Sequence, residues 1–398
     1  MKMLQARLRG LGSTIETEWF ELNPRLNLFK FTDRNSGARF INGLQTINPP
    51  FSCTGVRPFS SFPNISRHRG YLRRINPKKR TIAMAVFGAT PKLVGELAKN
   101  SDLLYETDRI EVGRRLDYSR WISFVELSSS SRYGEITADI DHLLQQSKRV
   151  APHLAAELCS IVENTLPSDR IKQELKDNLL RWLQGARQEL GPELQQVIET
   201  TSEVVKRADY FKAARDTVFQ RLPLFLNLGS SSMPHSCDKL LQWMSNQALR
   251  YNDNATYNER IFLDDVNHQL SLLHFFKTPS RIDCIGGTFS VREETSRNNN
   301  KKSSPNDMLQ HLQKLVCLAI ALCRSVYHTE PILLFNGPEK ILPEASHPAL
   351  VQFICEISKI CQSLYVSPRL DIFPNDIGAK VYTDSELIGK KIVHPAYQ

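Results

Sequence analysis

The stretch LNLFKFTDRNSGARFINGLQTI, residues 26–47, constrains the fold more than any other part of the chain. A short apolar run at its start predicts a buried strand, and a turn that contains Gly37 follows it. Ile41 and Leu44 are spaced three apart, so we expect a helix that begins near Phe40. Strand, glycine-containing loop and helix are the setting of a phosphate-binding loop, but the lysine that such a loop carries is missing.

The composition is that of a globular protein. Of the 398 residues, 41% are hydrophobic and 23% are charged, and at roughly 100–200 residues per domain this length predicts two or three domains. The chain has no apolar run of the ~18–20 residues that a membrane span needs, and its first residues lack the apolar core of a signal peptide. We therefore expect a cytoplasmic protein that does not bind a membrane.

Eight cysteines are spread along the chain, and none of them forms a CxxC pair. Cys317 and Cys323, like Cys355 and Cys361, lie in apolar stretches with helical spacing, which indicates buried free thiols in a reducing compartment. The ten histidines are scattered, and no spacing typical of zinc ligands occurs. We expect no metal site and no cofactor.

Positive charge is concentrated in one segment. The chain carries a net charge of +9, and residues 51–100 hold ten Lys/Arg residues against one acidic residue, Glu96. Such a segment favours the phosphate backbone of a nucleic acid, although an acidic protein partner and a solvated loop without a partner stay open. The candidate contact residues are Arg57, Arg67, Arg69, Arg73, Arg74, Lys78, Lys79 and Arg80.

The spacing of the apolar residues changes along the chain and predicts three parts. Residues 1–137 form an N-terminal α/β lobe, residues 138–226 follow a period of 3.6 and form a compact helical insertion, and residues 227–398 form a C-terminal lobe. We expect the insertion to act as a lid or as a protein-docking surface. The C-terminal lobe is predicted to contain a helix over 308–327, a strand over 331–337 and a helix over 347–364.

The order of these elements resembles the head of ABC-type ATPases of the SMC/RecF/Rad50 class. The opening LRGLGSTIETEWFELNPRLNLF is similar to the start of that family, where a hairpin precedes the P-loop. The later stretch EPILLFNGPEKILPEASHPALVQFICEISK looks like its Walker B region. The resemblance implies an α/β fold with a P-loop-like mixed sheet and a helical insertion, in which both ends of the chain surround one nucleotide.

The Walker A motif of that family, G-x-x-x-x-G-K-[ST], is eroded in this chain. Thr32 stands at the first glycine, while the second glycine is kept as Gly37. Ala38 stands at the lysine and Arg39 at the hydroxyl residue that holds Mg²⁺. Arg34 or Arg39 could still bind a phosphate, but not in the same geometry.

The other motifs are eroded as well. Asn336 and Gly337 stand where the resemblance places the Walker B carboxylates, and Glu339 is the nearest carboxylate, two positions late. The signature loop aligns loosely with residues 303–307 and has lost both glycines, and no histidine follows in SLYVSPRLDIFPNDIG. Phosphoryl transfer depends on the charge stabilisation that the lysine and the metal carboxylates supply, so we do not expect ATP hydrolysis.

We therefore interpret the chain as a non-catalytic scaffold or regulatory subunit on a degenerate ABC-ATPase head. It would bind a protein partner, with nucleic acid as a further partner, and the resemblance suggests DNA repair or prokaryotic antiviral defence, including CRISPR-associated systems. One alternative is a divergent nucleic-acid-dependent ATPase that uses Arg34, Arg39 and Glu339. A second is a nonspecific nucleic-acid-binding protein, and an ordinary α/β protein also stays open.

Overall fold

The architecture comes from a computed structural model of the whole chain. Seven of the eight basic candidates, Arg57 to Lys79, lie outside the described residues, as do Ser303 and Ser304 of the signature region. The structure describes residues 1–9, 16–49, 80–100, 105–115, 117, 119–125, 127, 131–169, 171, 173–228, 259–273, 280–285, 288–293 and 305–387.

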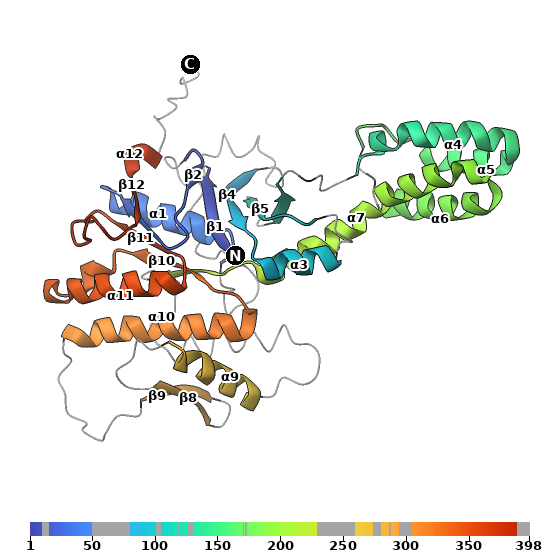
Figure 1. Cartoon of the computed structure of the whole chain (residues 1–398). Helices are drawn as coiled ribbons and strands as arrows, with labels where there is room; N and C mark the ends of the chain where they lie inside the picture. Colours follow the sequence, from blue (N-terminus) through green and yellow to red (C-terminus); the bar gives the residue numbers. More distant parts are fainter. Residues whose placement is uncertain are drawn as a thin grey trace, which may run out of the picture. The chain divides into compact units, whose positions relative to one another are not determined.

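The chain divides into two compact units. Unit 1 contains residues 1–88, 111–122 and 221–398, and unit 2 contains residues 89–110 and 123–220. The predicted α/β fold with a helical insertion is confirmed, since most of unit 2 is the predicted insertion (Figure 1). The boundaries predicted after residues 137 and 226 stay predictions.

A five-stranded sheet in unit 1 joins the two ends of the chain. Its order is β12-β3-β11-β10-β7, and each neighbouring pair is parallel. Strand β3, from the N-terminal end, pairs with β11 and β12 from the C-terminal end. The strands are β3 (Leu26–Lys30), β7 (Phe225–Leu228), β10 (Ile332–Asn336), β11 (Ser363–Ser367) and β12 (Lys380–Thr383).

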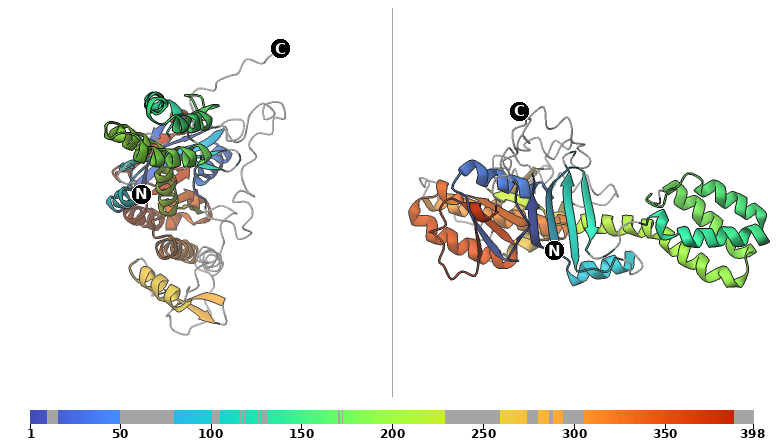
Figure 2. Two further views of the ribbon diagram at one scale, coloured as in Figure 1. Left: turned by 90° about the vertical axis from the view of Figure 1, so that its right-hand side faces the viewer. Right: turned by 90° about the horizontal axis from the view of Figure 1, so that it is seen from above.

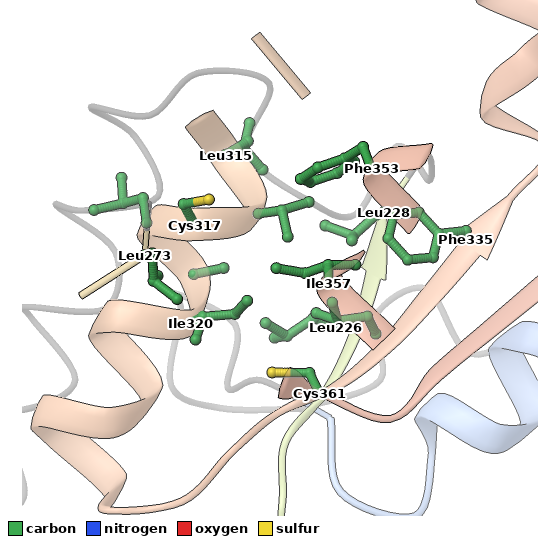
Figure 3. Close-up of a cluster of buried hydrophobic side chains, with 14 of the residues drawn as sticks. Leu226, Leu228, Leu273, Leu315, Cys317, Ile320, Phe335, Phe353, Ile357 and Cys361 are labelled. Atoms are coloured by element: carbon green, nitrogen blue, oxygen red, sulfur yellow. The ribbon is translucent and has the colours of Figure 1, made fainter. Parts of the chain in front are cut away.

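The parallel sheet buries apolar side chains on both of its faces, as its near-continuous apolar strands require. One face packs on the apolar sides of α10 and α11, and Figure 3 shows Leu226, Leu228 and Phe335 of the sheet beside helix residues such as Ile320 and Ile357. Helix α9 packs in turn against α10. Cys317, Cys323 and Cys361 are buried free thiols, as predicted, whereas Cys355 is half-buried. The helices are α9 (Glu259–Ser271), α10 (Pro305–Tyr327) and α11 (His347–Ile360).

A second sheet has the order β2-β1-β4-β5-β6 and contains antiparallel pairs. The predicted N-terminal hairpin is confirmed, because β1 runs antiparallel to β2 with Gln5 opposite Glu21, and β4 pairs antiparallel to the other side of β1. The strands are β1 (Lys2–Leu8), β2 (Phe20–Glu21), β4 (Thr81–Gly88), β5 (Arg109–Arg115) and β6 (Arg120–Phe124).

Unit 2 is largely helical and has a hydrophobic core of its own. Apolar residues between Tyr133 and Val205 form that core, with Trp182 at 2% exposure as its largest side chain. Figure 2 shows α4, α5, α6 and the first part of α7 packed side by side as a bundle. The elements are α3 (Pro91–Asn100), η1 (Tyr133–Glu135), α4 (Thr137–Val150), α5 (Pro152–Val162), α6 (Gln173–Glu189), η2 (Pro192–Leu194) and α7 (Gln195–Arg221).

The remaining elements are short, apart from α1, which follows β3. Strands β8 and β9 form an antiparallel hairpin beside α9. Among the described helices, none is long and apolar enough to cross a membrane. The elements are α1 (Arg34–Gln45), β8 (Ser280–Ile285), β9 (Thr288–Glu293), η3 (Pro338–Ile341), η4 (Glu344–Ser346) and α12 (Asp384–Leu387).

Candidate functional site

The loop between β3 and α1 is shorter than the sequence suggested. Helix α1 begins at Arg34 and not near Phe40, so the predicted start was wrong. Asp33 is the N-cap residue: its carboxylate accepts hydrogen bonds from the backbone N–H groups of Asn35 (3.1 Å) and Ser36 (2.9 Å). A capping aspartate stabilises a helix start because it satisfies N–H groups that have no partner within the helix.

Carboxylates occupy the place where a P-loop would receive phosphate. The Asp33 carboxylate also accepts from Ser36 Oγ at 2.7 Å, and the Gly37 N–H donates to the Asp33 carbonyl at 3.2 Å. Thr32 donates its hydroxyl and its N–H to Asp384 Oδ2, at 2.5 and 3.3 Å. The backbone N–H groups of Thr32, Asn35, Ser36 and Gly37 are therefore already bonded within the chain.

The hydrogen bonds of the two aspartates also favour their charged forms. Bonds from the Ser36 hydroxyl and from the N–H groups of Asn35 and Ser36 lower the pKa of Asp33. The bond from the Thr32 hydroxyl lowers the pKa of Asp384. Both side chains are thus negative at neutral pH, and they would repel the phosphates of a nucleotide.

Gly37 is a packing residue in this fold. It lies in the first turns of α1, and a Cβ atom on it would come within 2.9 Å of Val366 Cγ1 and 3.3 Å of Phe31 Cβ. The glycine lets α1 approach β11 and the end of β3 closely. Close packing therefore explains the glycine at this position without a bound phosphate.

Replacing Gly37 with alanine is expected to destabilise the protein by about 1–3 kcal/mol, because the added methyl group overpacks the contact with Val366. The matched control is Gly185→Ala in α6, where a Cβ would meet nothing within 4 Å. That change should stabilise by up to about 1 kcal/mol, since alanine is the better helix former. Urea unfolding of both variants measures the difference; stabilisation by Gly37→Ala would contradict the packing role.

The basic residues of the loop lie on the helix and not in a phosphate cradle. Arg34 is the first residue of α1, and its side chain lies outside the described residues. Ala38 and Arg39 follow within the helix and are half-buried. The positive charge of Arg39 lies close enough to Asp33 to help lower the pKa of that carboxylate.

The second half of the predicted site lies at the end of β10. Asn336 is the last residue of that strand and is half-buried. Gly337 has a φ of 56°, in the left-handed region that favours glycine, and its N–H donates to the Val366 carbonyl at 2.9 Å. The backbone turn thus explains the glycine at this position.

Glu339 lies buried against β11, with 5% of its surface exposed. Its carboxylate accepts hydrogen bonds from the hydroxyl groups of Tyr365 and Ser367, the latter at 2.5 Å. Burial, followed by the bond to Glu339, raises the pKa of Tyr365 well above its ordinary value, so the phenol stays protonated and remains a donor. The backbone carbonyl of Glu339 lies 3.1 Å from His347 Nε2.

These contacts give Glu339 a structural role. A general base must reach the water or hydroxyl from which it takes a proton, but both carboxylate oxygens of Glu339 face hydroxyl donors of the same core. The residues on the two strand ends therefore do not fit a magnesium nucleotide. Among the described residues, no three His, Cys, Asp or Glu side chains are placed to hold a metal ion.

The structure places Thr32 and Gly37 around the start of α1, and it places Asn336, Gly337 and Glu339 at the end of β10 and in η3. Of the basic candidates it describes only Arg80, which directly precedes β4 and is half-buried. Sequence reasoning missed four residues whose side chains make these hydrogen bonds: Asp33, Asp384, Tyr365 and Ser367. Only Asp33 gave a local signal, as a capping residue followed three positions later by Ser36.

Comparisons with known proteins give remote likenesses only. No family model matches the chain, and no curated protein matches it. Among solved structures, an SMC head domain of Pyrococcus furiosus, bound to the C-terminal domain of ScpA, is 10% identical with a TM-score of 0.36, and the match covers 93% of this chain and 90% of that one.

Two further solved structures give similar values. The SMC head domain of Thermotoga maritima is 10% identical with a TM-score of 0.35, and the match covers 94% of this chain and 90% of that one. The recombination mediator RecF bound to ATPrS is 10% identical with a TM-score of 0.36, and the match covers 94% of each chain.

Proposed function

We propose that this chain is a non-catalytic, protein-binding subunit built on an SMC/RecF-like head whose nucleotide site no longer works. The observation that carries the proposal is the Asp33 carboxylate, which fills the start of α1 where a nucleotide phosphate would bind. The joining of β3 with β10, β11 and β12 in one sheet supports the resemblance, which implies that the two chain ends come together.

The chemistry at the strand ends also favours a binding function over catalysis. Phosphoryl transfer requires cations around the phosphates and a residue that positions the nucleophile. Here Asp33 and Asp384 stand near the helix start, and the nearest carboxylate of β10, Glu339, is held by Tyr365 and Ser367. A divergent ATPase would have to break these bonds.

A phosphate-release assay with ATP, Mg²⁺ and duplex DNA tests the proposal against a nucleic-acid-dependent ATPase. We expect no release above that of a protein-free control. Mg²⁺-dependent release that is lost in Glu339→Gln, while that variant still folds, would overturn the non-catalytic function and support the divergent ATPase. The DNA-free reaction shows whether any release depends on nucleic acid.

The protein partner is proposed to dock on surfaces that are not needed for the core. The bundle of unit 2 has its own hydrophobic core. The outer surface of the bundle can therefore serve as the protein-docking surface that we expect of the insertion. The setting in DNA repair or in antiviral defence, including CRISPR-associated systems, rests on the family resemblance alone.

Nucleic acid is a second candidate partner, because ten of the 51 Lys/Arg residues lie between positions 51 and 100 with a single acidic residue. If these side chains neutralise phosphates, affinity for a DNA duplex should fall steeply with salt, by a slope of about −0.9 per phosphate contact. Replacing Arg73, Arg74, Lys78, Lys79 and Arg80 with alanine should flatten that slope by several units. Fluorescence anisotropy at a series of salt concentrations checks this; an unchanged slope would exclude these residues as contacts.

A further inference from the structure

Helix α7 buries two stripes of side chains that lie on nearly opposite sides. In its first half Ile198, Thr201 and Val205 are at most 3% exposed and face the bundle core. In its second half Ala214 and Val218 are fully buried. Ala214 follows Val205 by nine residues, about two and a half turns of an α-helix, so the two stripes point in opposite directions.

The segment between the stripes has little packing of its own. No described side chain from Lys206 to Ala213 is buried. Half-buried Phe211 packs in this segment, with its ring 5.8 Å from that of Tyr105 and 6.0 Å from that of Phe124. The helix nevertheless continues without a break through this segment (Figure 2).

One residue of this segment connects the two sides. Arg207 Nη1 lies 3.0 Å from Glu135 Oε2, in η1 at the edge of the bundle, and both side chains are partly buried. The carbonyl of Arg207 accepts a hydrogen bond from the Tyr105 hydroxyl at 3.3 Å, on the other side. The segment that leads into η1 is fixed nearby, since Ser131 Oγ donates to the Val204 carbonyl at 2.5 Å.

We propose that residues 206–213 of α7 form a hinge, here called the joint, about which the bundle pivots as one body. The Glu135–Arg207 ion pair, here called the catch, restrains this motion. A helix without buried side chains opens locally at low free-energy cost, whereas each flanking segment is fixed by its own stripe. The bundle can thus change its angle without losing its core. This device is independent of the proposed function, because it involves neither the β3–α1 loop nor Glu339.

Hydrogen exchange on the full chain tests the joint with Arg207→Ala. A partly exposed ion pair contributes only modestly to stability, so we expect backbone amides of residues 206–213 to exchange about threefold faster. Amides of the bundle and of residues 214–218 should keep their native rates. Arg207→Lys, which can restore the ion pair, should behave as the native chain.

The matched control is Arg187→Ala. This change removes an ion pair of 2.6 Å between Arg187 and Glu199, which also links α7 to the bundle but lies outside the proposed joint. It should leave the exchange of residues 206–213 unchanged. Unchanged exchange in Arg207→Ala would overturn the catch, and faster exchange spread evenly through the bundle would overturn the pivoting of the bundle as one body.

Discussion

Replacing Glu339 with alanine is expected to lower the free energy of unfolding by about 3 kcal/mol, although this residue stands beside a predicted nucleotide site. The carboxylate is buried and accepts hydrogen bonds from the hydroxyl groups of Tyr365 and Ser367. Alanine would leave both hydroxyl groups without their acceptor in a closed core, and each unsatisfied buried group costs roughly 1–3 kcal/mol. The turn after β10 would also lose its side-chain bonds to β11 and keep only backbone bonds such as that from Gly337 to Val366.

Urea unfolding of unit 1, followed by the near-UV signal of its tyrosines, measures this loss. Glu344→Ala is the matched control, because that glutamate lies five residues later with 83% of its side chain exposed, and a surface change of this kind stays within about 0.5 kcal/mol. Equal stability of the two variants would show that Glu339 is not a structural residue. The carboxylate would then again be a candidate for catalysis.

Replacing Trp182 with alanine should destabilise the bundle of unit 2 by about 3–5 kcal/mol, the usual cost of removing a large buried aromatic side chain. Trp182 is 2% exposed, and its indole N–H donates to the Leu154 carbonyl at 2.9 Å. The change thus creates a cavity and leaves a carbonyl without its donor. Because the bundle core is separate from the core around the parallel sheet, the damage should stay local.

Hydrogen exchange distinguishes local from global damage. In Trp182→Ala the amides of α4, α5 and α6 should lose protection, while those of β10 and β11 keep it. Phe335→Ala, which empties a fully buried position of the sheet core, should give the reverse pattern. Equal loss of protection in both regions of either variant would contradict the independence of the two cores.

The sequence predicted those elements whose apolar pattern is strong and continuous. The runs around LNLF and ILLF are the buried parallel strands β3 and β10, and the predicted helix over 308–327 is α10, which begins at Pro305. Such runs are assigned correctly because a strand that is buried on both faces needs apolar residues at nearly every position. The change to a helical period likewise located the bundle of unit 2.

Ends of elements were predicted less well, since single polar residues decide them. The helix predicted over 347–364 ends at Ile360, and Ser363 already pairs in β11. The start of α1 was placed near Phe40 because Gly37 suggested a loop, but capping by Asp33 and close packing against Val366 make this segment helical. A helix tolerates glycine where another element must approach closely.

Contacts between distant residues could not be predicted from one sequence. Glu339 and Tyr365 are 26 positions apart, and Thr32 and Asp384 are 352 apart. They meet because β3, β10, β11 and β12 share one sheet, an order that local patterns do not specify. The sequence therefore placed Thr32 and Glu339 shortly after predicted strands, but it could not identify the groups that contact them.

A thermal melt of the native chain with and without millimolar ATP and Mg²⁺ tests the central claim most directly. A ligand that binds only the folded state at 100 times its dissociation constant would stabilise it by about 2.7 kcal/mol. Because Asp33 and Asp384 occupy the loop, we predict no change in the melting temperature. A clear Mg²⁺-dependent rise would contradict the account, since it would show that the site still binds a nucleotide.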